Sequence, residues 1–274
     1  MRLATIREGD STAAVRVDGE RATAIGGVSD VGALLADPAW WALAESASGA
    51  THDVAALDFA PLVPRPDKIV CVGLNYRSHI LETGRAVPEY PTLFAKFRSS
   101  LIGAHDEIEL RPAVQSLDWE AELAIVIGSA VRDADETRAK AAIAGFTVLN
   151  DVTARDWQNR TLQWLQGKTF EHSTPVGPCL VTTDTFDGTT GAITCVINGE
   201  TMQESDVGDL VFGPTALVSY ISTIVTLLPG DIIATGTPAG VGAARTPPRF
   251  LAAGDVVVTR IAGVGELRNT CAGA

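Results

Sequence analysis

The stretch that decides the fold is residues 117–128, which read LDWEAELAIVIG. Its alternating pattern predicts a β-strand, whose successive side chains point to opposite faces. The expected core face carries Trp119, Ala121, Leu123, Ile125 and Ile127. The opposite face begins with carboxylates and then becomes apolar: Asp118, Glu120, Glu122, Ala124 and Val126. A face that changes in this way differs from the uniformly polar face of a solvated strand.

Glu120 and Glu122 lie two residues apart on that second face, so their charges repel each other. A bound divalent cation would stabilise such a pair, because it neutralises both carboxylates. The alternative is a strand end in water, where both glutamates are simply solvated, as most charged residues are. The pattern of two glutamates alone leaves both interpretations open.

The composition describes an acidic globular protein. The 274 residues are 46% hydrophobic, enough for a large core or for one large and one small domain. A formal net charge of −12 disfavours nucleic acid and anionic membranes as partners, although a local pocket could still bind a small anion. No apolar run approaches the ~20 residues of a membrane span, no signal-peptide pattern is seen, and the four cysteines are scattered. We therefore expect a cytoplasmic protein without a nucleic-acid or membrane partner.

An α+β, mostly β chain with two domains is expected. Residues 1–62 contain short strand and helix patterns and predict a small N-terminal α/β domain. Prolines extend the tract 61–66, which predicts a linker into a catalytic domain over residues 63–274. Further predictions are strands at 68–73, 144–149, 180–181 and 255–261, a hairpin at Asn198-Gly199, a helix over 214–228 and a lid loop at 84–92.

Asp151 ends the strand pattern at 144–149, one helix and one strand after Glu122. If this strand lies beside 117–128, the Asp151 carboxylate can reach Glu120 and Glu122. Three carboxylates make an oxygen-rich site that suits Mg²⁺, Mn²⁺ or Ca²⁺. The set contains no histidine, which argues against zinc.

His79 and Glu82 are three residues apart in a short helical pattern, so they face the same way. A carboxylate orients an imidazole and raises its basicity, which suits a general base that activates water. The alternative is an ion pair on the surface of a short helix.

Other polar residues are candidates for binding the substrate. Arg155, Gln158 and Lys168 could bind a substrate carboxylate, or could be ordinary surface residues. The glycine-rich loop 236–242 lacks G-K-[ST] and a following helix, so it is not a P-loop. Its Thr237 hydroxyl and backbone N–H groups are better suited to lining a substrate site.

Six blocks of sequence, taken in order, resemble the fumarylacetoacetate hydrolase family. They are VGLNYRSH at 72–79, PTLFAKF at 91–97, DWEAELAIVIG at 118–128, LNDVTARD at 149–156, GKTF at 167–170 and TGTP at 235–238. The resemblance extends over residues 65–270, and residues 1–60 resemble the small N-terminal domain of many bacterial members. It implies a mixed β-sandwich or β-roll catalytic domain that usually forms a homodimer.

The resemblance also implies roles for individual residues. Glu120, Glu122 and Asp151 would hold Mg²⁺ or Mn²⁺, with Ca²⁺ as a non-physiological substitute. His79 and Glu82 would form the water-activating dyad, on a lid that orders when substrate binds. The residues that would contact the substrate or its developing negative charge are Arg155, Gln158, Lys168 and Thr237.

Two features of the sequence are left open by the resemblance. Members often read D-x-F-x-P after G-K-x-F, whereas this chain has EHSTP at 171–175. That change would either reshape the pocket or alter only the packing. Asp118 is expected to support the site from behind the metal ligands.

The implied reaction is metal-dependent hydrolysis of a C–C bond in a 2,4-dioxo acid, such as an acylpyruvate or fumarylpyruvate, in aromatic catabolism. The metal would act as a Lewis acid, the His79–Glu82 dyad would activate water, and Lys168 would stabilise the oxyanion, with a metal-stabilised enolate as the leaving group. The alternatives are an oxaloacetate-type decarboxylase or a 2-hydroxymuconate-type isomerase on the same 2-oxo acid site. A non-catalytic binding protein is a third class, which the complete set of expected site residues argues against.

Overall fold

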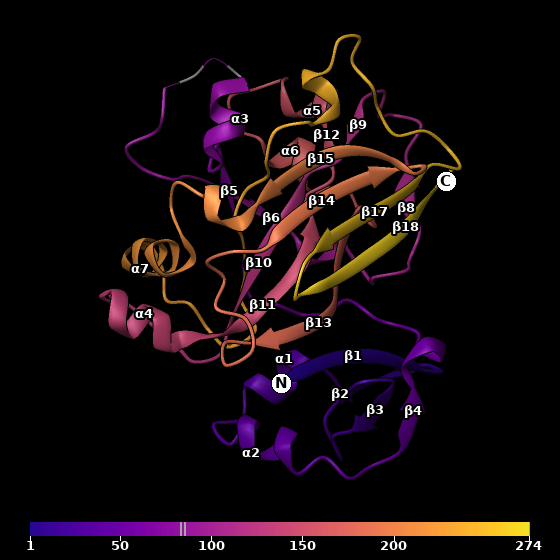
Figure 1. The fold of residues 1–274 in the computed structure, drawn as a ribbon, viewed down its shortest axis with the longest axis vertical. Helices are drawn as coiled ribbons and strands as arrows, with labels where there is room; N and C mark the ends of the chain where they lie inside the picture. Colours follow the sequence, from indigo (N-terminus) through magenta and orange to yellow (C-terminus); the bar gives the residue numbers. More distant parts are fainter. Residues whose placement is uncertain (83, 85, 274) are drawn as a thin grey trace.

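The structure is a computed structural model that describes residues 1–82, 84 and 86–273. It is mostly β (Figure 1), which confirms the predicted fold class. The main sheet has the strand order β4-β3-β2-β1-β13-β11-β10-β16-β5-β6, and β7 pairs with β13. Its strands are β1 (Arg2–Glu8), β2 (Ser11–Asp18), β3 (Arg21–Ala24), β4 (Thr51–Asp53), β5 (Ile69–Gly73), β6 (Thr92–Lys96), β7 (Leu101–Ile102), β10 (Ala121–Ile127), β11 (Ile143–Asn150), β13 (Thr174–Thr182) and β16 (Ile232–Ala234).

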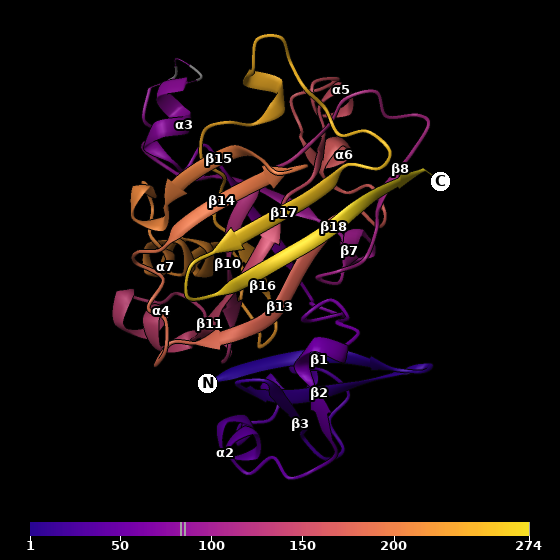
Figure 2. The ribbon, with the colours of Figure 1, turned by 45° about the vertical axis from the view of Figure 1, so that its right-hand side comes forward.

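A second sheet packs against the first, where β14, β17 and β18 contact β10, β11 and β13 (Figure 2). Its order is β15-β14-β17-β18-β8. The strands are β8 (Ile108–Leu110), β14 (Ala192–Ile197), β15 (Glu200–Asp206), β17 (Val256–Ile261) and β18 (Gly265–Gly273). A third, two-stranded sheet joins β9 (Leu117–Asp118) to β12 (Thr153–Ala154).

The helices are short and lie around the sheets. They are α1 (Val31–Leu35), α2 (Trp40–Glu45), α3 (Arg77–Glu82), α4 (Glu136–Ala142), α5 (Arg155–Gln158), α6 (Leu165–Lys168) and α7 (Pro214–Ile224), with 3₁₀ turns η1 (Val54–Ala56), η2 (Arg98–Ser100), η3 (Val207–Asp209) and η4 (Gly242–Ala244). Among the residues that the structure describes, none of the helices is both long and apolar enough to cross a bilayer.

The stretch 117–128 is two strands rather than the single strand predicted. It breaks at Trp119 and Glu120, because β9 pairs with β12 whereas β10 pairs with β11 and β16. The backbone at the break keeps its hydrogen bonds: the Glu120 N–H donates to Asn150 Oδ1 at 2.9 Å, and the Glu120 carbonyl accepts from the Asp151 N–H at 2.8 Å. Both contacts tie Glu120, at the change of pairing partner, to the end of β11.

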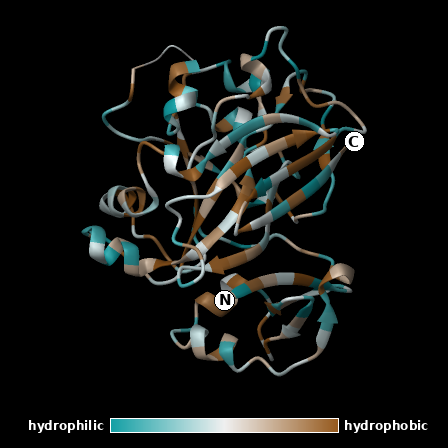
Figure 3. Ribbon diagram, in the orientation of Figure 1, coloured by the Kyte–Doolittle hydropathy of each residue, from teal (hydrophilic) through white to brown (hydrophobic). Residues whose placement is uncertain are grey.

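Both faces of β10 are buried, because two hydrophobic cores meet on it. Its predicted core face, together with Trp119, belongs to a core that includes inward residues of the second sheet, such as Ile193 and Leu267. The other face places Ala124 and Val126 in a second core that includes Leu34 of α1. Figure 3 shows apolar residues along these central strands. The apolar half of the second face thus has its own packing partner, which explains why that face is not polar throughout.

The N-terminal strands continue the main sheet. Strand β1 pairs with β13 at Arg2↔Val181 and Leu3↔Leu180, so β1–β4 and the rest of the sheet share one hydrogen-bonded path. The division into domains 1–62 and 63–274 stays a prediction.

Several predicted elements differ in extent from those observed. The hairpin at Asn198-Gly199 is confirmed, and both turn residues have positive φ (52° and 84°), as a two-residue hairpin requires. The helix from 214 ends at Ile224, and the short strand predicted at 180–181 is the nine-residue β13. Strand β18 was not predicted, because its exposed face is polar and its apolar residues are few.

Candidate active site

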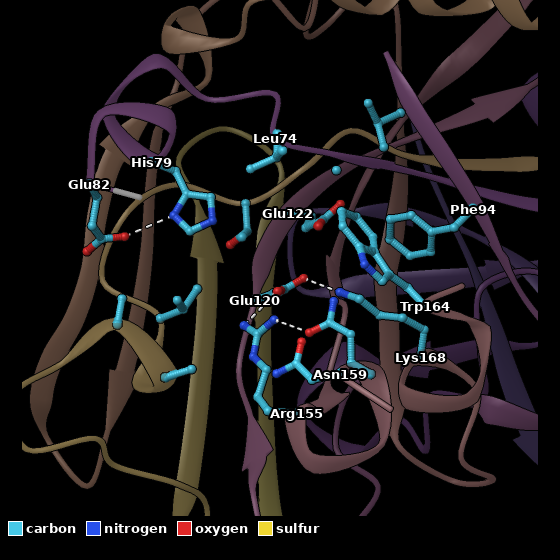
Figure 4. A pocket seen from close by; sticks show the side chains of 17 residues that line it. Leu74, His79, Glu82, Phe94, Glu120, Glu122, Arg155, Asn159, Trp164 and Lys168 are labelled. Atoms are coloured by element: carbon cyan, nitrogen blue, oxygen red, sulfur yellow. Dashed lines mark hydrogen bonds and ion pairs between the residues drawn. The ribbon is translucent and has the colours of Figure 1, made fainter. Parts of the chain in front are cut away.

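A cavity of about 480 Å³ lies between the turn after β5, the start of β10, the α5–α6 segment and the loop after β16 (Figure 4). Eight of the nine predicted site residues line it: His79, Glu82, Glu120, Glu122, Arg155, Gln158, Lys168 and Thr237. The ninth, Asp151, is fully buried beside Lys168. The structure therefore brings all nine predicted site residues to one region.

Strand pairing brings the three acidic residues together. β10 and β11 are antiparallel neighbours, with Ala121 opposite Asn150, so Asp151 emerges next to Glu120. Glu120, Glu122 and Asp151 each offer an oxygen within 4.8 Å of the others. All three side chains are buried, which rules out the solvated strand end as the explanation of the two glutamates.

The electrostatics of the three carboxylates are unequal. Burial raises the pKa of Glu122 well above its ordinary value, and the nearby charges of Asp151 and Glu120 raise it further. Burial also acts to raise the pKa of Asp151, but Lys168 and Lys96 outweigh it and the pKa is lowered. In the described part of the chain no ion pair reaches Glu122, whose Oε2 accepts the Gly236 N–H at 2.7 Å.

This arrangement fits a divalent cation. The donors are carboxylate oxygens, which hard cations prefer, and a cation would stabilise the buried negative charge that the surroundings of Glu122 otherwise disfavour. Glu120, Glu122 and Asp151 are therefore a candidate metal site.

Lys168 lies between two members of this triad. Its Nζ is 2.5 Å from Glu120 Oε2 and 2.8 Å from Asp151 Oδ2, and it is 5.0 Å from the centre of the Phe94 ring. Burial acts to lower its pKa, but Asp151 and Glu120 outweigh that effect, so the pKa is raised. Lys168 is therefore a cation in this site and not a base.

Arg155 links the triad to Asp118. Its Nε donates to Asp118 Oδ2 at 2.8 Å, its Nη1 donates to Gln158 Oε1 at 3.0 Å, and its Nη2 lies 2.7 Å from Glu120 Oε1. The last contact is an ion pair without the angle of a hydrogen bond. Asp118 is fully buried and also accepts the N–H groups of Gly242 and Ala243 at 2.7 and 2.9 Å. It thus holds both Arg155 and one wall of the cavity in place from behind.

Sequence reasoning missed Lys96. It ends β6, its side chain is fully buried, and its Nζ lies 2.7 Å from Asp151 Oδ1 and 3.3 Å from the Val152 carbonyl oxygen. The block PTLFAKF contains this residue, and a lysine at the end of an apolar strand was the available signal. The missing information was its partner, which lies 55 residues further along the chain.

Two glycines allow close packing in and around the α5–α6 segment. A side chain at Gly167 would meet Gln158 backbone atoms at 2.5 and 2.6 Å, so only glycine lets α6 pack on α5. A side chain at Gly73 would meet the Trp164 ring at 2.3 Å. Trp164 precedes α6 and also contacts Phe94 edge-on, which fixes the start of the helix that carries Lys168.

The His79–Glu82 pair forms a second group in the cavity, on α3. His79 Nδ1 lies 2.9 Å from Glu82 Oε2, and the other carboxylate oxygen accepts the Gly240 N–H at 3.1 Å. An ionised carboxylate can only accept, so Nδ1 carries the proton and Nε2 is left as the free base. The pair lies on a different side of the cavity from the Lys168–Glu120–Arg155 group (Figure 4).

The predicted lid is only partly described. Residue 85 of the range 84–92, and residue 83 of the predicted helix, lie outside the described residues. Of the lid residues that the structure does describe, none lines the cavity. Tyr90 instead faces Tyr220 of α7, with ring centres 6.4 Å apart.

Thr237 and the segment 171–175 complete the set of sequence predictions. Thr237 lines the cavity, and its hydroxyl accepts from Gln203 Nε2 at 2.8 Å, which leaves its own hydrogen free to donate. Residues 171–175 are absent from the described lining of the cavity. Ser173 is buried and donates to the Phe170 carbonyl oxygen at 2.7 Å. The EHSTP segment therefore lies beside the site and does not form its wall.

Comparison with known proteins agrees with this architecture. The oxaloacetate tautomerase Fahd2a, mitochondrial, of Rattus norvegicus is 48% identical over 213 residues, which are 77% of this chain and 68% of that protein. The fumarylacetoacetate hydrolase of Exiguobacterium antarcticum is 30% identical, with a TM-score of 0.88 over 100% of both chains. The 5-carboxymethyl-2-hydroxymuconate delta-isomerase of Mycobacterium smegmatis is 31% identical, with a TM-score of 0.83 over 100% of both chains.

The family description "Fumarylacetoacetate (FAA) hydrolase C-terminal" matches residues 68–272. That range contains every residue that lines the cavity, and the strands of the two packed sheets apart from β1–β4 and Gly273 at the end of β18. The chain therefore belongs to the fumarylacetoacetate hydrolase family.

Proposed function

We propose that this protein is a metal-dependent tautomerase that interconverts the keto and enol forms of a 2-oxo dicarboxylic acid of the oxaloacetate type. The similarity to the rat oxaloacetate tautomerase supports this choice within the family. The observation that carries it is the placing of a free imidazole nitrogen and an acidic triad around one cavity. Such a site can exchange a proton at carbon while stabilising the negative charge that forms on oxygen.

Glu120, Glu122 and Asp151 would hold Mg²⁺ or Mn²⁺, since both prefer carboxylate oxygens. When bound, such a cation would polarise the 2-oxo group and make the neighbouring C–H more acidic. The remaining chemistry belongs to the side chains of the chain itself.

His79 is the proton carrier. Its Nε2 would take a proton from C3 of the keto acid, and a proton would be returned to O2, so that atoms balance without a co-reactant. Glu82 keeps the proton on Nδ1 and stabilises the imidazolium that forms. The Gly240 N–H fixes the Glu82 carboxylate in this orientation.

Lys168 and two neutral donors would act on the substrate's oxygens. Lys168 brings a buried positive charge to the side of the cavity where the enolate oxygen develops. Because Arg155 can only donate, the oxygen of Gln158 must face it, and the Gln158 amide N–H₂ is left for a substrate carboxylate. The Thr237 hydroxyl offers a further donor.

A second candidate is the C–C hydrolase of a 2,4-dioxo acid, for which the same dyad would activate water. The size of the cavity favours it: about 480 Å³ lies in the range of pockets that hold ligands much larger than a four-carbon acid.

We also propose a homodimer in solution, which light scattering of the purified protein tests.

The test is a panel of substrates assayed with Mg²⁺, with Mn²⁺ and with chelator. We expect metal-dependent acceleration of the decay of enol-oxaloacetate, with no pyruvate released. Faster cleavage of acylpyruvates than tautomerisation would replace this function by the hydrolase, and pyruvate plus CO₂ from oxaloacetate would replace it by a decarboxylase. Inactivity on every member of the panel would contradict both candidates.

A further inference from the structure

Lys96 is a buried cation that the proposed reaction does not use. Its side chain is fully buried, and the residue is absent from the described lining of the cavity. Its ammonium instead lies 2.7 Å from Asp151 Oδ1, on the opposite carboxylate oxygen from the one that Lys168 contacts. A buried lysine costs free energy to desolvate, so a second lysine on one aspartate needs an explanation.

The net charge of the site explains why a second lysine lies on Asp151. The four buried carboxylates are Asp118, Glu120, Glu122 and Asp151, and the three cations are Lys96, Arg155 and Lys168. With all carboxylates ionised, as metal binding requires, the cluster has one net negative charge. A divalent cation changes this to one net positive charge, which attracts an anionic ligand.

Without Lys96 the same count does not become positive when the metal binds. The cluster would carry two negative charges before metal binding and none afterwards. The metal would then bind more tightly, but the loaded site would lose its attraction for a carboxylate.

We propose that Lys96 is a positioning residue that sets the net charge of this site, so that the metal-loaded cavity is positive and selects a carboxylate-bearing ligand. Lys96 acts through Asp151 and does not touch the ligand. This inference rests on the proposed metal site at Glu120, Glu122 and Asp151, but not on which reaction follows.

The test measures two affinities in Lys96→Met. Calorimetry gives the Kd of Mn²⁺ alone and the Kd of oxalate at saturating Mn²⁺; oxalate carries adjacent oxygens like those of a 2-oxo acid. We expect Mn²⁺ to bind on the order of tenfold more tightly and oxalate on the order of tenfold more weakly than in the wild type, since a unit charge nearby acts on both. Lys96→Arg keeps the charge and should restore both affinities to within about threefold.

Lys68→Met is a matched control. Lys68 also pairs with a fully buried aspartate, with Nζ 3.0 Å from Asp231 Oδ2, but neither residue is in the described lining of the cavity. Both affinities should be unchanged in this variant, which separates a local charge effect from a general loss of packing.

The two shifts in opposite directions decide the result. If Lys96→Met weakens the binding of both Mn²⁺ and oxalate, Lys96 only holds Asp151 in position and the inference is wrong. If the variant folds only with Mn²⁺, the oxalate affinity of the loaded protein still decides, because an unchanged value would contradict the inference. If the wild type binds no Mn²⁺, the proposed metal site itself fails, which is a different outcome.

Discussion

The two sides of the cavity are built differently. The triad side is held by the pairing of β10 with β11 and by buried ion pairs to Lys96, Lys168 and Arg155. The dyad side rests on the one short helix α3, and its side chains are 12% and 28% exposed. The triad is thus fixed by the core, whereas the dyad depends on local hydrogen bonds to Glu82 and Gly240.

The two sides should therefore respond differently to mutation. A change on the triad side leaves buried charges without partners, so it should affect stability, metal binding and activity together. A change on the dyad side leaves the sheet intact, so it should affect the chemical step alone.

Glu120→Ala should produce the largest loss. It removes one metal ligand and leaves Lys168 and Arg155 without a partner that lies 2.5 and 2.7 Å away. We expect no detectable Mn²⁺ binding or activity, and a free energy of unfolding lower by about 3–5 kcal/mol. Calorimetry and denaturant unfolding measure these effects. Glu200→Ala, which removes an exposed acid paired with Arg249, is the control and should change little. Retained metal binding in Glu120→Ala would contradict the assignment of Glu120 as a metal ligand.

His79→Gln should abolish most of the activity but leave metal binding and stability unchanged. General acid–base catalysis by a histidine contributes roughly 10²–10⁴-fold, so kcat should fall by that factor. The Kd of Mn²⁺ and the melting temperature should stay at the wild-type values, because His79 is outside the triad. Wild-type tautomerase activity in His79→Gln would contradict the role given to His79.

Glu122→Gln should separate stability from function. Burial and the charges of Asp151 and Glu120 raise the pKa of Glu122, so in the metal-free wild type the free energy of unfolding falls as the pH rises from about 4.3 through that raised pKa. The variant lacks this fall and should be more stable at pH 7 by about 1–4 kcal/mol. Mn²⁺ should stabilise the wild type but not the variant, as thermal unfolding at pH 5 and pH 7 will show. Parallel pH profiles for the two metal-free proteins would argue against a buried charge at Glu122.

Glu82→Gln should have the smallest effect. The imidazole remains, but it loses an ionised partner and Glu82's contact with the Gly240 N–H is weakened. We expect kcat to fall roughly tenfold, with Mn²⁺ affinity unchanged, as steady-state kinetics and calorimetry will show. A loss as large as that of His79→Gln would mean that the carboxylate itself carries the proton.

Local sequence patterns by themselves determined the direction of many side chains and several short-range contacts of this protein. The alternation in 117–128 predicted which side chains of β10 share a face, because side-chain direction in a strand depends only on the backbone period. The three-residue spacing of His79 and Glu82 predicted their contact, and Asn198-Gly199 predicted a hairpin, for the same local reason. The family motifs then indicated the chemistry.

Contacts between distant segments were decided only by the tertiary structure. Whether Glu120 and Glu122 are solvated or buried depends on two cores that meet on β10. Asp151 reaches them because it follows β11, which pairs with β10. The break at Trp119 and Glu120 arises from a change of pairing partner, which alternation cannot reveal. Lys96 could not be assigned from its own strand, since its role depends on Asp151 in another one. A side chain's direction follows from its neighbours in sequence, but its environment follows from the packing of the whole chain.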